Sequence, residues 1–304
     1  MPETVELRAT RCAICNTEGK AVELYPTNLD LEAFNPSVFS ARRLPDRIHY
    51  RMVRCNTCGL IRSDPVADSE VLAQLYEQST FDYVEEVANL QLTYGRYLAK
   101  LDGYGARKGS LLEIGCGNGF FLEEALRQGY EEVHGVEPST EAVARASEKV
   151  GPNIRCSMMR PGLFEADQFD VVCMFQVFDH IPDPEALLDE CFRVMKPGGL
   201  ILGLNHNVEA VSARLLGERS PIIDVEHMYL YSPKTMGHIL TEHGFRVKEA
   251  GSVTNDYTVN YLARLLPLPS LLKSGVMSLF GKTAIGRIQL RVPLGNLYIV
   301  AQKP

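Results

Sequence analysis

The sequence predicts an α/β protein built on a doubly wound, mostly parallel sheet of seven strands. From Ser110 onward, short apolar runs alternate with longer amphipathic runs, an order typical of parallel strands joined by helices on both faces of a sheet. The strand-like runs are LLEIG, EEVHGVE, NIRC, FDVVCMFQVF, LILGLN, FRVKEAGS and NLYIVAQK. The first run enters a glycine-rich turn and then FFLEEALRQG, as a Rossmann-like strand, tight turn and helix would.

Three segments with different patterns divide the chain. Residues 1–66 form a module that carries two C-x-x-C pairs. Residues 67–108 have apolar positions at helical spacing with aromatic residues interleaved, and they predict a helical bridge that also acts as a lid. Residues 109–304 hold the sheet, with an apolar, proline-interrupted insertion at about 255–293.

Composition and charge exclude several classes of partner. The 304 residues are 45% hydrophobic, enough for a sizeable core, and 31 Lys and Arg stand against 38 Asp and Glu, a net charge of -7. This balance gives no positive field to gather nucleic acid or anionic lipid. The start, MPETVELRAT, lacks a secretion signal, and no uncharged stretch reaches the roughly 18 to 20 apolar residues that span a bilayer. We therefore expect a soluble cytoplasmic protein with no transmembrane segment.

The cysteines in the first segment form the pattern of a metal site. Cys12 and Cys15 make one pair and Cys55 and Cys58 the other, which together supply the four thiolates of a tetrahedral zinc ion. Gly59 suits a turn whose amides face the sulfurs. A redox pair or two unrelated pairs are the alternatives, whereas a reducing cytosol disfavours a disulfide. Four protein ligands leave no open position, so this zinc would be structural.

The glycine-rich turn departs from the two common phosphate-binding patterns. Its glycines, Gly115, Gly117 and Gly119, stand at alternate positions. A dinucleotide-binding turn would have a further glycine where Phe120 stands, and no lysine follows in the position of a P-loop lysine. The turn is therefore predicted to hold a ligand other than a pyrophosphate.

Two acids near the turn indicate which ligand that is. Glu113 lies just before the first glycine, where a carboxylate would repel a pyrophosphate but can pair with an ammonium group. Glu137 ends the next predicted strand, where an acid can accept hydrogen bonds from both hydroxyls of a ribose. A ribose, an ammonium and no phosphate together describe S-adenosylmethionine.

Four motifs in order carry a resemblance to a known family. EIGCGNG, GVEPS, FDVVCMFQVFDHIPDP and MKPGGLILG, within residues 110–205, resemble the sequential motifs of class I S-adenosylmethionine-dependent methyltransferases. The resemblance implies that the three glycines back the methionine and ribose portion of the cofactor and that Glu137 holds the ribose. It also places Phe175 and Gln176 beside the methionyl group.

The segment after the third predicted strand departs from that family. Many relatives have an acid there that binds the adenine amine, whereas this chain has NIRCSMMRPG. Ser157, Met158 and Met159 would then bind adenine through backbone or apolar contact.

The front half resembles a narrower group. RCNTCGLIRSDP followed by LYEQSTFDYV is similar to the zinc-bearing N-terminal region of bacterial methyltransferases that act on nucleotide-linked deoxysugars. The resemblance implies a nucleotide sugar or related glycan precursor as the small-molecule acceptor. It also places Tyr83 against the cofactor and Tyr76 near it, with ordinary helix packing as the alternative for both tyrosines.

Three histidines are candidates for a catalytic base, which is needed if the acceptor must lose a proton. His180 follows the fourth predicted strand, His206 ends the fifth, and His227 lies in IIDVEHMYLYS. His227 is the leading candidate because Glu226 or Asp224 can orient its ring. The alternative for His180 is that it orders the turn into the next helix.

Other functions and partners remain open from the sequence. The apolar stretch at 261–290 can pack as helices on the sheet edge, close over the acceptor, form a homodimer contact, or attach shallowly to a membrane. An RNA methyltransferase is one alternative function, disfavoured by the acidic balance. A non-catalytic, cofactor-binding partner subunit is the other.

Overall fold

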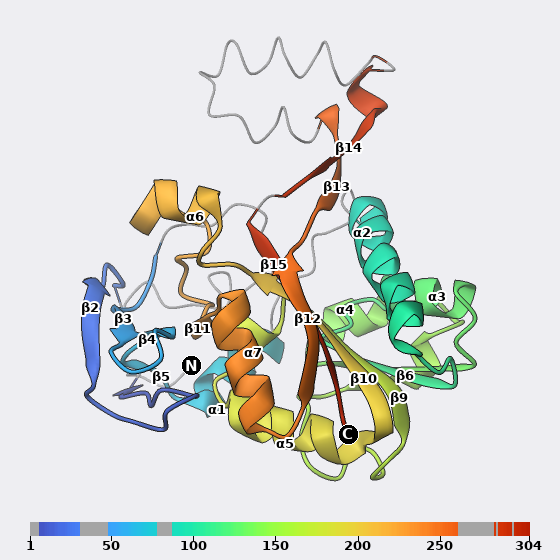
Figure 1. Ribbon diagram of the computed structural model, residues 1–304, viewed down its shortest axis with the longest axis horizontal. Helices are drawn as coiled ribbons and strands as arrows, with labels where there is room; N and C mark the ends of the chain where they lie inside the picture. The colour runs from blue at the N-terminus through green and yellow to red at the C-terminus, as the bar shows by residue number, and fades with distance from the viewer. Residues whose placement is uncertain (1–5, 31–47, 78–86, 261–282, 284, 294) are drawn as a thin grey trace.

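The computed structural model describes residues 6–30, 48–77, 87–260, 283, 285–293 and 295–304. Within this part of the chain a seven-stranded sheet has the order β12-β15-β10-β9-β6-β7-β8 (Figure 1). Its strands are β6 (Ser110–Ile114), β7 (Glu132–Glu137), β8 (Ile154–Cys156), β9 (Phe169–Phe175), β10 (Met195–His206), β12 (Arg246–Ser252) and β15 (Asn296–Gln302). β8, β7, β6, β9 and β10 run parallel, and β15 lies antiparallel between β10 and β12. The predicted doubly wound, mostly parallel sheet is confirmed.

Helices cover both faces of this sheet (Figure 1). α5 (Pro184–Val194) and α7 (Pro233–Glu242) pack on one face. α2 (Val87–Lys100), α3 (Phe120–Arg127) and the short α4 (Thr140–Ala144) lie on the other. Successive side chains of a strand point to opposite faces, so Val171 and Cys173 of β9 enter one core while Val172 and Met174 enter the other. All four are fully buried, which explains why this strand reads as a continuous apolar run.

The cysteine-bearing module shares a sheet with the C-terminal part of the chain. In a four-stranded antiparallel sheet of order β11-β4-β3-β2, β2 (Ala21–Tyr25), β3 (Met52–Cys55) and β4 (Ile61–Ser63) are joined by β11 (Tyr229–Leu230). β1 (Leu7–Arg8) pairs with β5 (Val66–Ala67). Buried Cys12, Tyr50 and Leu60 belong to the same apolar core as α5 and α7. The module is therefore joined to the later part of the chain by backbone pairing with β11, and to the large sheet by a common core.

The predicted bridge contains two helices, α1 (Ser69–Glu77) and α2. Tyr83, expected against the cofactor, lies outside the described residues. α2 continues into the 3-10 turn η3 (Leu101–Tyr104). Leu72 and Leu75 bury α1 in the core that holds α5, whereas α2 packs on the opposite face of the sheet.

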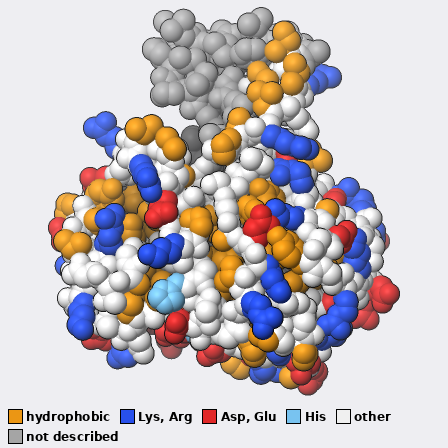
Figure 2. Space-filling model, viewed as in Figure 1, with side chains coloured by type: hydrophobic (Ala, Val, Ile, Leu, Met, Phe, Trp, Pro, Cys, Tyr) orange, Lys and Arg blue, Asp and Glu red, His pale blue; other side chains and the backbone are white. Residues whose placement is uncertain are grey.

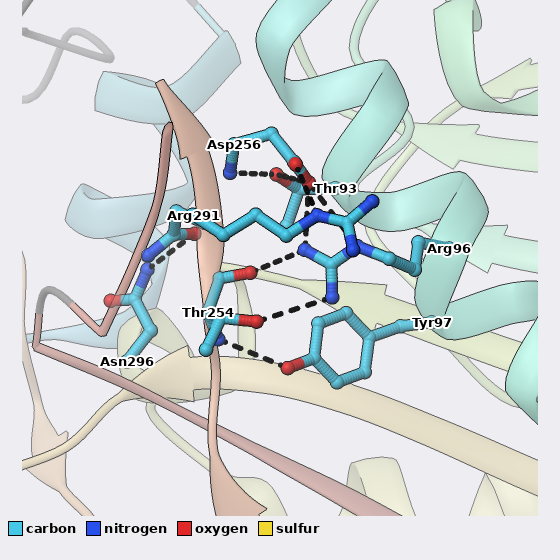
Figure 3. A network of polar contacts seen from close by, with 8 residues as sticks. Thr93, Arg96, Tyr97, Thr254, Asp256, Arg291 and Asn296 are labelled. Carbon is cyan, nitrogen blue, oxygen red and sulfur yellow. Dashed lines mark hydrogen bonds and ion pairs between the residues drawn. The ribbon is translucent and has the colours of Figure 1, made fainter. Parts of the chain in front are cut away.

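A polar network fixes α2 to a hairpin formed by β13 (Asn255–Thr258) and β14 (Gln289–Val292) (Figure 3). Arg96 of α2 donates to Asp256 at 2.7 Å, and the amide of Asp256 donates to Thr93 Oγ1 at 2.9 Å. Arg291 donates to the other carboxylate oxygen of Asp256 at 3.1 Å. Because Asp256 is 6% exposed and bonded on both sides, it holds the hairpin and the bridge helix in one position.

Exposed apolar side chains gather near this hairpin and on α6 (Val211–Leu216), as Figure 2 shows. Val211 is 73% and Leu215 81% exposed, and Ile288 is 50% exposed. Most of the apolar stretch predicted as an insertion, residues 261–282, lies outside the described residues. The remaining short turns are η4 (Gly151–Asn153), η5 (Phe178–His180), η6 (Gly217–Arg219) and η7 (Ile285–Arg287). In the described part of the chain, no helix has the length and apolar character needed to cross a bilayer.

Candidate active site

A cavity of about 620 Å³ opens at the carboxyl ends of β6, β7, β9 and β10. This is the edge at which open α/β sheets bind ligands. The last residues of these strands, Ile114, Glu137, Phe175 and His206, all line it. The parallel direction of these strands thus brings Glu137 and Phe175, predicted to bind the cofactor, and His206, a predicted base candidate, to one cavity.

The glycine turn forms one wall of the cavity. Gly115, Gly117 and Gly119 have φ angles of 73°, 54° and 78°, in the left-handed region that glycine adopts without strain. Gly115 and Gly117 line the cavity, whereas Gly119 lies outside the lining. A Cβ atom on Gly119 would come within 2.8 Å of Val150 Cγ2, so this third glycine allows helix α3 to start close to the sheet. The structure thus gives a packing reason for this glycine, and its contact with the cofactor stays a prediction.

Glu137 is held in place by backbone amides. Its Oε2 accepts from Gly117 N and its Oε1 from Ser139 N, both at 2.9 Å. Burial raises the pKa of this carboxyl above its usual range, and the two amide donors work against that rise. Each carboxylate oxygen retains a second lone pair, so the group is oriented and still able to accept a ligand hydroxyl.

Glu113 is a buried acid in the wall of the cavity. It is 2% exposed, it lines the cavity, and its Oε2 has no hydrogen bond within the described residues. Burial, followed by the nearby charge of Glu137, raises the pKa of the Glu113 carboxyl well above its usual value. Leaving such a group ionised and unpaired is costly, so a ligand that donates a hydrogen bond or carries a positive charge would stabilise it.

An aromatic stack forms the wall beside the end of β9. The rings of Tyr94 and Phe175 lie 4.2 Å apart at 16°, and Phe120 stacks on the other side of Tyr94 at 6.0 Å. All three line the cavity. Gln176, next along the chain, has a φ of 55° and a buried Oε1 without a hydrogen bond in the described part of the chain. The polar atom of Gln176 is thus available to a ligand beside the stack.

The predicted adenine-binding segment lies at the same cavity. Ser157, Met158 and Met159 all contribute to the lining, together with Pro138 and Ala142. Ser157 N donates to Glu137 O at 3.0 Å, which ties this segment to the end of β7. The contacts offered here are mainly apolar, as expected where no acid follows the third strand.

The three candidate histidines converge on one buried carboxylate, that of Asp179. His206 Nδ1 lies 2.6 Å from Asp179 Oδ2, and His227 Nε2 lies 3.9 Å from the same oxygen. His180 Nε2 lies 3.7 Å from Asp179 Oδ1. The ring centroid of His227 is 4.8 Å from that of His180 and 4.7 Å from that of His206. We call Asp179, His180, His206 and His227 the histidine cluster.

The electrostatics of the histidine cluster favour neutral imidazoles at His180 and His227 and an ionised carboxylate at Asp179. Burial lowers the pKa of His227 to about 3, and the neighbouring His206 adds to the effect. Burial also lowers the pKa of His180. Although burial alone would raise it, the imidazoles of His206 and His180 hold the pKa of the Asp179 carboxyl below its usual range. Asp179 is thus the negative charge that organises the cluster.

Contacts from the N-terminal part of the chain position this cluster. Tyr76 Oη lies 3.1 Å from His180 Nδ1. Ser63 donates from Oγ to His227 O and from its amide to Met228 O, each at 2.9 Å. Met228 N donates in turn to Asp179 O at 2.8 Å. The backbone at 227–228 is therefore held between the cysteine-bearing module and the loop after β9.

The four cysteines of the module come together in space. The sulfurs of Cys12, Cys15, Cys55 and Cys58 lie within 4.8 Å of one another, and those of Cys12 and Cys58 are 3.4 Å apart. Burial would raise the pKa of the Cys55 thiol, but hydrogen bonds from the amides of Cys58 and Thr57 lower it to about 6. Four thiols with amides turned toward a sulfur suit a tetrahedral thiolate-binding metal.

Sequence reasoning missed three of the site's residues. Asp179 directly precedes a candidate histidine and sits in an otherwise apolar run, which is a signal that was available. Tyr94 was seen only as part of a helical pattern. Ser63 carries no signal, because it acts through pairing between segments more than 160 residues apart.

Comparisons with known proteins agree with this fold. A family model described as "Methyltransferase domain" matches residues 87–250. A ubiquinone biosynthesis O-methyltransferase of Psychrobacter cryohalolentis is 30% identical over 117 residues, covering 35% of this chain and 45% of that protein. A protein of the same name from Pseudomonas fluorescens is 28% identical over 162 residues, covering 50% and 67%. The chain thus spans about half the length of the first of these relatives.

Solved structures share the fold at low identity. The cyclase SpnF superposes with a TM-score of 0.51 at 16% identity, covering 79% of this chain and 98% of SpnF. A SAM-dependent methyltransferase of Archaeoglobus fulgidus has a TM-score of 0.48 at 21% identity, covering 78% and 100%. SpnF is described as a cyclase, so activity has to be argued from the site of each protein.

Proposed function

The chain belongs to the methyltransferase-domain family. We propose that it transfers a methyl group from S-adenosylmethionine to a small polar acceptor. One observation carries the proposal. A single cavity has Glu113, the glycine turn and Glu137 in its lining, and it also has the three histidines of the histidine cluster. The first set matches a cofactor with an ammonium and a ribose, and the second can take a proton from an acceptor.

The residues present fit S-adenosylmethionine. The partnerless Glu113 Oε2 suits the ammonium of the methionyl group, and the amide-held carboxylate of Glu137 suits the ribose hydroxyls. Met158 and Met159 offer apolar contact to adenine, and Phe175 and Gln176 lie where the methionyl group would pass. When bound, the cofactor supplies an activated methyl group, so the protein has mainly to position the acceptor and exclude water.

The histidine cluster supports an acceptor that loses a proton, such as a hydroxyl. His206 donates from Nδ1 to Asp179, which leaves Nε2 as the basic nitrogen at the cavity. His227 has the same kind of arrangement, with Nδ1 2.8 Å from Ile222 O. The curated relatives are named O-methyltransferases, which supports oxygen as the atom methylated. We infer that His206, paired to Asp179, is the leading base among the three histidines, ahead of the more buried His227.

The charge of the lining limits the acceptor. Among the described lining residues, carboxylates outnumber the single guanidinium, that of Arg160. The acids in the lining are Glu113, Glu137, Asp183, Glu190, Asp224 and Glu226. A diphosphate placed among these acids would be repelled. If the acceptor is a nucleotide sugar or related glycan precursor, as the resemblance implies, the sugar enters the cavity and the diphosphate stays outside it.

We also propose a structural zinc ion bound by the four cysteines. The proposal is supported by the convergence of the four sulfurs. The ion would hold β3 and β4 together, and through Ser63 it would also hold the segment that carries His227. Purified protein should then contain about one zinc per thiolate site, and metal analysis tests this.

Methyl transfer is tested by incubating the protein and labelled S-adenosylmethionine with a fractionated extract of its own cell. We expect label in a small-molecule fraction and none with Asp179→Asn, while calorimetry shows cofactor binding in both proteins. Label in RNA would support the RNA alternative. Binding without transfer to any fraction would support a non-catalytic subunit and overturn the proposed activity.

A further inference from the structure

We propose that Asp179, His206 and His227 bind a divalent transition-metal ion at the acceptor end of the cavity. One ligand atom from each residue lies within 4.8 Å of the others. All three come from different parts of the fold: the turn after β9, the end of β10, and the segment before β11. This site is separate from the four cysteines and goes beyond the proposed methyl transfer.

The orientation of the His227 imidazole is that of a metal ligand. The carbonyl of Ile222 can only accept, so His227 Nδ1 carries the hydrogen at 2.8 Å and Nε2 presents its lone pair to the cluster. That lone pair faces Asp179 Oδ2 at 3.9 Å. Two acceptors face one another stably when a cation lies between them. Metal-bound histidines usually donate their other nitrogen to a carbonyl or carboxylate in this way.

One oxygen of the Asp179 carboxylate is buried with no hydrogen bond from the described residues to offset the cost of its burial. Asp179 is 1% exposed, and within the described residues its Oδ1 is buried without a hydrogen bond. His180 Nε2 is 3.7 Å from this oxygen, beyond hydrogen-bond distance. A buried acid of this kind is costly unless it is paired or coordinates a cation. The ion supplies the missing positive charge.

The donor set selects a class of metal. Two imidazoles and one carboxylate suit zinc, cobalt, nickel or iron better than magnesium or calcium. Ligands about 2.0 to 2.2 Å from such an ion stand roughly 3.3 to 3.6 Å apart in a tetrahedron. The 3.9 Å pair needs little movement. For His206 to bind the ion through Nδ1, the hydrogen on Nδ1 moves to Nε2 and the 2.6 Å hydrogen bond to Asp179 opens. In the metal-bound form His206 is then a ligand and not the base, and the ion activates the acceptor in its place.

Three protein ligands leave one open coordination position on a four-coordinate ion. The direction of this position indicates what the ion would do in the site. His206 and His227 line the cavity, so the open position faces the acceptor. A hydroxyl or keto oxygen in this position would be oriented, and a bound hydroxyl would lose its proton more readily. This role rests on the proposed function, whereas binding of the ion does not.

The experiment measures Co²⁺ binding to the full chain by visible absorption, together with the total metal content of the purified protein. Co²⁺ bound to the thiolate site produces intense sulfur-to-cobalt absorption. A second equivalent of bound Co²⁺ that adds only weak absorption bands therefore indicates binding at the histidine site. We expect about two bound ions per chain, one for each proposed site. His227→Gln should retain the thiolate signal and weaken the second event by more than the 10- to 100-fold that loss of an outer partner costs.

A matched control is available on the surface. His243 Nδ1 pairs with Asp189 Oδ1 at 2.7 Å, but Asp189 is 74% exposed. His243→Gln removes a similar histidine–aspartate pair and should leave both cobalt events unchanged.

The outcomes separate this site from the proposed function. A single thiolate-type event in the wild-type protein would overturn the metal site, even if a histidine variant failed to fold. So would a second event that His227→Gln and His206→Gln both leave intact. Metal binding at the second site without methyl transfer would support the site and reject the enzyme, because the cobalt titration needs no turnover.

Discussion

Replacing Glu113 by glutamine tests the cofactor end of the cavity. The carboxyl is 2% exposed, its Oε2 has no partner in the described part of the chain, and burial raises its pKa well above the usual value. Binding of an ammonium group would pull that pKa down again. At pH below the raised pKa, the free protein is expected to hold a proton on Glu113 that the complex releases.

The expected loss of S-adenosylmethionine affinity can be estimated from the charged hydrogen bond between the Glu113 carboxylate and the cofactor's ammonium group. A hydrogen bond to a charged group contributes about 1.5 to 3 kcal/mol, or about 10- to 150-fold in affinity at roughly 1.4 kcal/mol per tenfold. We expect Glu113→Gln to weaken S-adenosylmethionine binding by that factor at pH above the raised pKa. Below it, wild-type affinity should rise about tenfold per pH unit as pH increases, because one proton must leave. The variant should show no such slope.

Calorimetry in buffers of different ionisation enthalpy measures the proton directly. Wild type should release up to about one proton per cofactor bound at pH below the raised pKa, and Glu113→Gln none. Glu131→Gln, at an exposed glutamate after α3, is the control and should behave as wild type. Equal affinity and equal proton release in wild type and Glu113→Gln would refute the ammonium assignment.

The same pKa shift has a consequence for folding. An acid whose pKa is raised in the folded state holds more protons there than in the unfolded chain, so its contribution to stability is present at low pH and is lost as pH rises through the folded pKa. Without cofactor, the free energy of unfolding of Glu113→Gln should therefore exceed that of wild type by an amount that grows as pH rises from the unfolded-state pKa toward the raised folded-state pKa. Denaturant melts at two pH values measure the difference.

Further substitutions test the other parts of the site. Glu137→Ala removes the acceptor for two amides and should weaken cofactor binding by roughly 1 to 3 kcal/mol, measured by calorimetry. Asp179→Asn should lower turnover at least about 100-fold with cofactor affinity nearly intact, since it disorders the imidazoles that take the proton; Asp189→Asn is its surface control. Cys58→Ser should lower the metal content and the melting temperature together, which plasma mass spectrometry and calorimetry detect. Ser63→Ala removes the bond to His227 O and should reduce turnover while cofactor affinity stays unchanged; equal turnover would mean that the β4–β11 pairing alone positions that segment.

Much of the fold could be predicted because its signals are local. Buried parallel strands such as FDVVCMF read as apolar runs, and the amphipathic runs between them read as helices. The position of Glu137 at the end of a strand, and of Gly115 and Gly117 in a turn, also follows from neighbours in the chain. These features bring the cofactor residues to one edge of the sheet whatever the rest of the chain does.

The sequence by itself thus determined the α/β sheet and the family, and it predicted which residues bind the cofactor. Only the tertiary structure decided that His180, His206 and His227, open alternatives in the sequence, form one cluster around Asp179. It also decided that the cysteine-bearing module helps to build that cluster through Ser63. The reason is physical: periodicity and turn chemistry act over a few residues, whereas the cluster depends on contacts between segments far apart in the chain, and no local pattern encodes these distances.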